Sequence, residues 1–464
     1  LESNIQKKDY FREFTEKRFH MKRIMAFLLS IMIVAGSVFS TPAVTKAYQV
    51  PSNLKWWAND RFGMFIHLGA YSSYGKGEWI MNVDKISKKK YQEEIASKFN
   101  PKNFNAKEIV SYAKKAGMKY IVITAKHHEG LALWDTKVES FKDYTGTKTF
   151  SLQQYTPFGA SGRDILMELK NACKEAGIHF GLYYSILDWN HSSQTISGDF
   201  TKMRSMEARK AYIQDMKAQL KELMTTYDPE IMWFDGDWTL RKSNPTLEKW
   251  WTKADGKDLY RYLKSIKSSV IVNERVCRNF GLGDFECPEQ TVPAADLTRP
   301  WETCQTMNNS WGYTKANEKW YRSSKSIVRE LVDVVSKNGN YLLNIGPKGD
   351  GSMTPKSKTV LKGVAKWMKK NSESIYGAVK SPFKKTPSWG KYTRKGKMVY
   401  VHVNKWPKNG KLAVTRYKKY KVKKVTCISN GKKYKYSTKG KTVKLKVGKK
   451  AVNTVDTVFA IQYQ

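Results

Sequence analysis

Five apolar runs, each ending on a polar or charged residue, constrain the fold of this chain more than any other feature. They occupy residues 62–67, 120–128, 179–184, 231–235 and 270–275. Continuous apolar runs of this length are typical of strands that are buried on both faces of a parallel sheet. Segments of helical periodicity lie between or after them, at residues 109–116, 165–176, 212–224 and 357–374. Strand and helix repeated in this order predict an α/β fold, with a (β/α)8-like barrel over residues 48–377.

The residues that end these runs are expected to share one pocket, because functional side chains of such barrels lie at the C-terminal ends of the strands. They are His67, His127, His128, Tyr184, Asp235 and Arg275. Asp235 ends its run beside Trp233, which suits a nucleophile, and Gly236 lets the chain turn away without crowding a ligand. The structural alternatives are a helix-capping role for Asp235 and an ion pair for Arg275. Together these residues indicate an acid/base site that binds a sugar.

A second carboxyl group is needed if the site belongs to a retaining glycosidase. In such enzymes a nucleophile and a proton donor lie about 5–5.5 Å apart. The loop after the fifth run holds three candidates, Asp284, Glu286 and Glu289. The residues alone do not choose among them, and each is equally consistent with a solvated loop acid.

A zinc site is the alternative for the histidines, since His67, His127, His128 and Asp235 are residue types that bind zinc. The sequence has no HExxH motif, and aromatic residues whose faces suit sugar rings accompany the cluster. These aromatic residues are Trp79, Trp134, Trp233 and Trp311. We therefore predict a sugar site with no metal and no organic cofactor.

Seven short motifs stand out over residues 55–377. They are residues 61–69 (RFGMFIHLG), 78–79 (EW), 125–130 (AKHHEG), 180–185 (FGLYYS), 233–236 (WFDG), 301–313 (WETCQTMNNSWGY) and 339–347 (GNYLLNIGP). In this order they resemble the motifs of the α-L-fucosidases of glycoside hydrolase family 29. The resemblance is highly specific because the KHHEG and WET…NNSWGY segments occur together.

The resemblance implies a role for individual residues. Asp235 matches the nucleophile, and Glu289, in the DFECPE segment, matches the acid/base. The fucose pocket would consist of His67, Glu78, Trp79, His127, His128, Tyr184, Trp233, Arg275 and Trp311. The implied activity is removal of terminal α-L-fucose from fucosylated oligosaccharides or glycoproteins with retained configuration. Two alternatives are a retaining exo-glycosidase for another sugar and a secreted glycan-binding protein with an inactive site.

Residues 21–47 have the pattern of a bacterial-type secretory signal peptide. Met21 begins a short basic region, residues 24–34 are mostly apolar, and small residues follow as far as Ala47. The apolar run is too short for a membrane span, so a signal anchor is the less favoured alternative. Residues 1–20, which precede this pattern, are interpreted as a gene-call extension. We expect a secreted or cell-surface protein.

The composition changes sharply after residue 377. Residues 381–464 contain one acid, Asp456, against two dozen lysines and arginines, and short alternating runs replace the helices. This pattern predicts a small, basic, antiparallel β-sandwich over residues 378–464. The formal net charge of the chain, +42, favours electrostatic attachment to an anionic cell wall or to acidic mucins. A basic surface that only maintains solubility is the alternative, and no motif supports specific nucleic-acid binding.

Overall fold

The computed structural model describes residues 50–197, 200–238 and 251–464. The predicted extension at residues 1–20 and the predicted signal peptide at residues 21–47 lie outside these ranges. None of the helices within the ranges combines the length and the apolar character that a membrane crossing requires.

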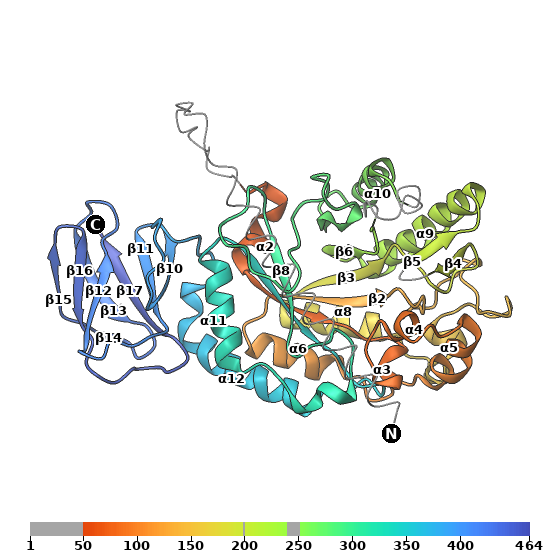
Figure 1. The fold of residues 1–464 in the computed structure, drawn as a ribbon, viewed down its shortest axis with the longest axis horizontal. Helices are drawn as coiled ribbons and strands as arrows, with labels where there is room; N and C mark the ends of the chain where they lie inside the picture. The colour runs from red at the N-terminus through yellow and green to blue at the C-terminus, as the bar shows by residue number, and fades with distance from the viewer. Residues whose placement is uncertain (1–49, 198–199, 239–250) are drawn as a thin grey trace, which may run out of the picture. The chain divides into compact units, whose positions relative to one another are not determined.

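Seven parallel strands form the central sheet, which curls into a half-barrel in the order β7-β6-β3-β2-β1-β9-β8 (Figure 1). Four of the expected runs form strands over most of their length. The fifth forms only a short strand before the chain enters a 3-10 helix at Glu274–Val276, so Arg275 lies on that helix and not on a strand. The strands are β1 (Phe62–Ile66), β2 (Tyr120–Lys126), β3 (His179–Ser185), β6 (Ile231–Asp235), β7 (Ile271–Val272), β8 (Glu302–Thr306) and β9 (Asn340–Ile345).

The expected eight-stranded barrel needs a correction at the edges of this sheet, because β7 and β8 do not pair with each other. An irregular segment, residues 285–289, lies between them and is joined to both through isolated parallel bridges. Phe285 pairs with Asn273 beside β7, and Glu289 pairs with Cys304 of β8. Pro288 has no N–H to donate to a neighbouring strand, so a continuous eighth strand does not form here.

Six longer helices follow the strands and contribute their buried faces to the main hydrophobic core. Each begins after a Ser, Thr, Asp or Asn whose side chain accepts a hydrogen bond from the first turn, which satisfies an otherwise unpaired N–H. The helices are α6 (Ala106–Lys115), α8 (Ile165–Ala176), α9 (Met206–Tyr227), α10 (Lys253–Ile266), α11 (Ser324–Val335) and α12 (Pro355–Asn371). The smaller elements are α2 (Lys55–Asp60), α3 (Tyr71–Tyr74), α4 (Ile80–Val83), α5 (Lys88–Glu94), α7 (Leu152–Tyr155) and the hairpin of β4 (Gln194–Ser197) and β5 (Phe200–Met203).

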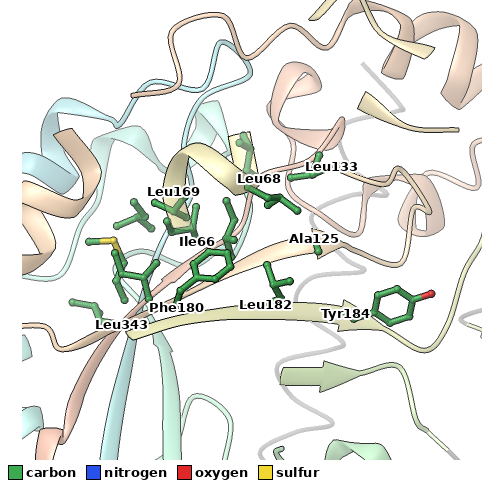
Figure 2. Packing of buried hydrophobic residues seen from close by; sticks show 14 of the residues in the cluster. Ile66, Leu68, Ala125, Leu133, Leu169, Phe180, Leu182, Tyr184 and Leu343 are labelled. Carbon is green, nitrogen blue, oxygen red and sulfur yellow. The ribbon is translucent and has the colours of Figure 1, made fainter. Parts of the chain in front are cut away.

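Side chains alternate along each strand between two separate cores. On β3, Phe180, Leu182 and Tyr184 belong to the core between sheet and helices, whereas Tyr183 belongs to the core inside the curled sheet. Figure 2 shows Phe180, Leu182 and Tyr184 projecting from the same side of β3. On β6, Trp233 belongs to the inner core. Because strand side chains have a period of two, Asp235 also faces inward, where the pocket lies.

A β-bulge near the end of β2 changes this alternation. Thr124 pairs with Tyr183 and Lys126 with Tyr184, so Ala125 is the extra residue. The ammonium group of Lys126 accordingly lies 4.6 Å from the ring centroid of Tyr184, on the helix side of the sheet. The bulge therefore turns His127, the next residue, toward the inside of the curled sheet.

The C-terminal region forms two antiparallel sheets around a separate hydrophobic core, as expected for a β-sandwich. A five-stranded sheet has the order β10-β11-β17-β13-β14 and a three-stranded sheet the order β12-β16-β15. The strands are β10 (Gly390–Lys395), β11 (Met398–Val403), β12 (Lys411–Thr415), β13 (Val422–Cys427), β14 (Lys432–Lys433), β15 (Tyr436–Lys439), β16 (Thr442–Lys446) and β17 (Thr457–Tyr463). Hydrogen bonds from Arg329 and Trp367, on α11 and α12, to the carbonyl groups of Val455 and Asp456 join the sandwich to the barrel helices.

Candidate active site

A pocket of about 300 Å³ lies inside the half-barrel, at the C-terminal ends of its strands. This volume is at the small end of the range for ligand pockets and suits a single small ligand such as one sugar residue. Nine of the residues that the sequence pointed to line it: His67, Trp79, His127, His128, Trp233, Asp235, Arg275, Glu289 and Trp311. The pocket also contains Phe65, Tyr183, Trp238, Arg278 and Cys304.

Two arginines hold the carboxylate of Asp235. Its Oδ1 atom accepts hydrogen bonds from Nη1 of Arg275 at 3.1 Å and from Nη2 of Arg278 at 2.8 Å. Burial by itself raises the pKa of Asp235, but Arg275, Arg278 and the nearby His128 outweigh burial and hold the pKa well below its usual value. The carboxylate is therefore ionised at neutral pH, as a nucleophile must be.

Gly236 is required where β6 ends. Its φ is +83°, and a Cβ at this position would lie 2.7 Å from the backbone nitrogen of Leu187. A side chain would therefore force both a strained backbone and a clash. The expectation that this glycine lets the chain turn away from the pocket agrees with this geometry.

The structure separates Glu289 from the other two loop acids. Residues Phe285, Cys287 and Glu289 alternate toward the inside of the curled sheet, where the first two belong to the inner core and Glu289 lines the pocket. Asp284 instead pairs with Lys264 of α10 at 2.9 Å, on the outer side. Arg275 connects Glu289 to Asp235, since its Nη2 atom donates to Oε2 of Glu289 at 2.8 Å. One guanidinium group thus contacts both carboxylates.

His128 presents an unprotonated ring nitrogen to Asp235. Its Nδ1 lies 2.6 Å from Oγ of Ser185, and that hydroxyl donates its own hydrogen to the carbonyl of Leu187. Nδ1 must therefore carry the ring hydrogen, which leaves a lone pair on Nε2, 3.7 Å from Oδ2 of Asp235. Burial lowers the pKa of His128 to about 4, so the ring is neutral at neutral pH and can accept a hydrogen bond from a sugar hydroxyl.

His67 is fixed in the same tautomer by a different partner. Its Nδ1 lies 2.7 Å from Oδ1 of Asn344, whose Nδ2 donates to the carbonyl of Trp311 at 2.7 Å. Burial lowers the pKa of His67 to about 3. The ring is therefore neutral, and its Nε2 is a second acceptor for a hydroxyl group.

Aromatic rings make up much of the pocket wall. The guanidinium of Arg275 lies 4.6 Å from the ring centroid of Trp233, and Tyr183 stacks on Trp233 with centroids 5.7 Å apart. The indole N–H of Trp233 donates to the buried carboxyl group of Glu302 at 3.2 Å, and Tyr120 donates to the other oxygen. Burial raises the pKa of Glu302 to about 7. Glu302 thus fixes the indole N–H of Trp233, whose side chain lines the pocket.

Two predicted site residues are not in the pocket. Tyr184 points to the helix side of the sheet, where its hydroxyl donates to Gln219 of α9 at 2.7 Å, and Tyr183 takes its place in the pocket. Glu78 is buried behind the wall and accepts a hydrogen bond from the backbone N–H of Gly312 at 2.8 Å. It therefore holds the segment that carries Trp311 instead of lining the pocket.

Sequence reasoning also missed pocket residues. Phe65 lies two residues before His67, so the two-residue period of a strand places both side chains on the same face and could have predicted Phe65. Tyr183 lies one residue before Tyr184 and therefore on the opposite face from it. Arg278 and Trp238 lie in loops, where no periodic pattern predicts the direction of a side chain. Within the described ranges, no three His, Cys, Asp or Glu side chains form a group suited to hold a metal ion.

Comparisons with known proteins identify the family of the chain. A family model described as alpha-L-fucosidase matches residues 39–373. The alpha-L-fucosidase of Dictyostelium discoideum is 30% identical over 349 residues, which cover 70% of this chain and 71% of that protein. The plasma alpha-L-fucosidase of Homo sapiens is 30% identical over 397 residues, which cover 79% of this chain and 78% of that protein.

Solved structures show the same fold. Alpha-L-fucosidase isoenzyme 1 from Paenibacillus thiaminolyticus superposes with a TM-score of 0.78 at 30% identity, over 89% of this chain and 99% of that one. A family 29 α-L-fucosidase from Bacteroides thetaiotaomicron, described as a trapped covalent intermediate with 2-fluoro-fucosyl fluoride, has a TM-score of 0.77 at 27% identity, over 92% and 100% of the two chains. The chain therefore belongs to the α-L-fucosidase family, glycoside hydrolase family 29.

Proposed function

We propose that this protein hydrolyses terminal α-L-fucosyl groups with retained configuration, by double displacement. The observation that carries the proposal is the pair of carboxylates, Asp235 and Glu289, which face one sugar-sized pocket and are joined by Arg275. The covalent intermediate of the Bacteroides relative supports the same chemistry. An inactive glycan-binding protein would have no need of both groups.

In the first step, Oδ2 of Asp235 attacks the anomeric carbon of fucose. The bond between that carbon and the glycosidic oxygen breaks, and Glu289 transfers its proton to the departing oxygen. Because Oε2 of Glu289 accepts from Arg275, the proton to be transferred is carried on Oε1. The product is an ester between fucose and Asp235, with inverted configuration at the anomeric carbon.

In the second step, Glu289 is a carboxylate and accepts a proton from water. The water oxygen bonds to the anomeric carbon, and the bond to Oδ2 of Asp235 breaks. The second inversion restores the original configuration. His67 and His128, both neutral acceptors, bind sugar hydroxyls, and the rings of Trp233 and Trp311 pack against the apolar edge of the sugar.

The test follows the configuration of the first product. We expect 1H NMR of a reaction with an aryl α-L-fucoside to show α-L-fucose before mutarotation produces the β-anomer. The matching aryl β-D-galactoside and α-D-galactoside should be turned over far more slowly. Initial formation of β-L-fucose would contradict double displacement, and faster turnover of a galactoside would favour the other-sugar alternative.

We further propose that the protein acts outside the cell and that its basic sandwich attaches it to polyanionic glycans. The only acid in residues 381–464, Asp456, is fully buried and bonded to His402 at 2.8 Å. It therefore cannot neutralise the surface lysines. On the outer face of the three-stranded sheet, the exposed Lys411 and Lys446 pair directly across the strands, and Lys444 is exposed beside them. Opposed like charges destabilise a sheet, so a bound anion would relieve a cost that the free protein bears.

We expect the triple variant Lys411→Glu, Lys444→Glu, Lys446→Glu to elute from immobilised dextran sulfate at clearly lower salt than the wild type. A matched control, Lys102→Glu, Lys362→Glu, Lys366→Glu, changes the net charge equally with exposed barrel lysines. Wild-type retention should fall with salt, since 0.1 M salt screens charges beyond about 10 Å. Turnover of a small neutral fucoside should stay the same in both variants. Equal loss of retention in both variants would show that retention depends on the net charge of the whole protein and not on a binding surface of the sandwich.

A further inference from the structure

The nucleophile is tied to a second, fully buried carboxylate through one arginine. Asp237 has no exposed surface and lies two residues after Asp235, beyond the turn at Gly236. Its Oδ1 accepts from Nε of Arg278 at 2.8 Å, and its Oδ2 accepts from the backbone N–H of Arg278 at 2.5 Å. Nη2 of the same guanidinium lies 2.7 Å from Oδ1 of Asp237 and 2.8 Å from Oδ1 of Asp235.

This arrangement does more than join two loops. An ion pair with a purely structural role would be complete with Asp237 and Arg278 alone. Here the guanidinium is shared, so the position of Arg278 determines where Oδ1 of Asp235 is held. Arg275, the other arginine on Oδ1, is also bonded to Glu289, whose protonation changes during the reaction. Arg278, in contrast, contacts only Asp237 and Asp235 among these carboxylates, and both keep their charge until Asp235 itself reacts.

The two oxygens of Asp235 are therefore not equivalent. Oδ1 accepts from two guanidinium groups, whereas Oδ2 has the unprotonated Nε2 of His128 at 3.7 Å. Hydrogen bonds withdraw electron density from the oxygen that accepts them, so Oδ2 keeps the more available lone pair. In the ester, Oδ1 becomes the carbonyl oxygen and stays bonded to the arginines. When the ester breaks, the returning negative charge is stabilised by the same groups.

We propose that Asp237 is a positioning residue, which acts through Arg278 to orient Asp235 and to make Oδ2 its attacking oxygen. The proposal rests on the assignment of Asp235 as nucleophile. It predicts that loss of the Asp237 charge slows the formation of the ester while the pocket still binds the sugar, because Asp237 itself lies behind the pocket wall.

The variant Asp237→Asn keeps the size of the side chain but replaces the carboxylate that accepts hydrogen bonds from Arg278 with an uncharged amide. We expect the rate of covalent labelling by 2-fluoro-fucosyl fluoride, and kcat for an aryl fucoside, to fall about 10- to 100-fold, the cost of a small misplacement of a reacting group. Inhibition by free L-fucose should change much less. The acidic limb of the kcat/KM profile should move to lower pH, because the variant removes a negative charge that repels the carboxylate of Asp235 and so raises its pKa, while Arg278 remains beside it.

Two further variants separate positioning from stability. Arg278→Lys keeps the charge, but a single ammonium group cannot bond both aspartates in the fork geometry of arginine, so labelling should slow as in Asp237→Asn. Asp333→Asn, on α11 and away from the pocket, removes a carboxylate that pairs with Lys337 and with Lys391 of β10, and should leave labelling and the pH profile unchanged. If Asp237→Asn lowers only the melting temperature and keeps the wild-type labelling rate and acidic limb, the pair is structural and the inference is wrong. An unlabelled, inactive wild type would instead contradict the proposed function.

Discussion

Replacing Asp235 with alanine is expected to abolish nearly all turnover while the protein stays folded. No ester can form without the carboxylate, and loss of a nucleophile of this kind costs about 10⁴-fold or more in kcat. The fold should survive because neither arginine is left without a partner: Arg275 keeps Glu289, and Arg278 keeps Asp237. Steady-state kinetics with an aryl α-L-fucoside, together with the melting temperature, measure the two effects.

Azide provides a test that a simple loss of activity does not. The space vacated in Asp235→Ala admits a small anion on the face from which the carboxylate attacks. We expect sodium azide to restore part of the turnover and to give β-L-fucosyl azide, the inverted product of a single displacement. The same azide concentration should not accelerate the wild type in this way. Near-normal activity of Asp235→Ala without azide would show that another group is the nucleophile.

Replacing Glu289 with alanine is expected to affect substrates according to their leaving groups. A dinitrophenolate departs without a proton, whereas the hydroxyl of a sugar or an alkyl alcohol needs one. General acid catalysis contributes about 10²- to 10⁴-fold, so kcat/KM should fall by such a factor for an unactivated fucoside and far less for 2,4-dinitrophenyl fucoside. With the activated substrate, hydrolysis of the ester should become limiting, because that step still needs the base.

The neighbouring Glu286 is the matched control for this experiment. It lies in the same segment but on the opposite parity from Glu289, and its backbone pairs with Trp301. Glu286→Ala should therefore hydrolyse both substrates at rates close to the wild type. Should Glu286→Ala show the dependence on leaving group and Glu289→Ala lack it, the acid/base assignment moves to Glu286.

The sequence by itself predicted four of the parallel strands over most of their length, four of the six longer helices and the candidate nucleophile, Asp235. Buried parallel strands must be apolar throughout, so runs such as residues 231–235 are recognisable in the sequence. The polar residue that ends such a run is expected at the C-terminal face of the barrel. The basic sandwich could also be predicted from the sequence, because strands with lysines at alternate positions can bury only their other, apolar face. The motifs of the family added the identity of the sugar.

Only the tertiary structure decided which of two adjacent side chains faces the pocket. Tyr183 and Tyr184 are chemically alike, and a period of two does not say which of them is inside until the strand is paired with its neighbours. The bulge at Ala125 turns His127 inward by the same kind of shift, which depends on the pairing of β2 with β3. Neither the orientation of Tyr183 nor the bulge at Ala125 can be predicted from the local sequence.

The tertiary structure also determined the environment of the nucleophile. Arg278 meets Asp235 across 43 positions of the chain, and Asp237 holds it from a loop with no periodic pattern. The parity of Glu289 follows from the segment between β7 and β8, which occupies its place because both edges of the sheet need hydrogen-bond partners there. Such contacts arise when distant loops close around a shared charge. Local pattern therefore predicted many of the elements and the candidate nucleophile, and packing decided how that side chain is held.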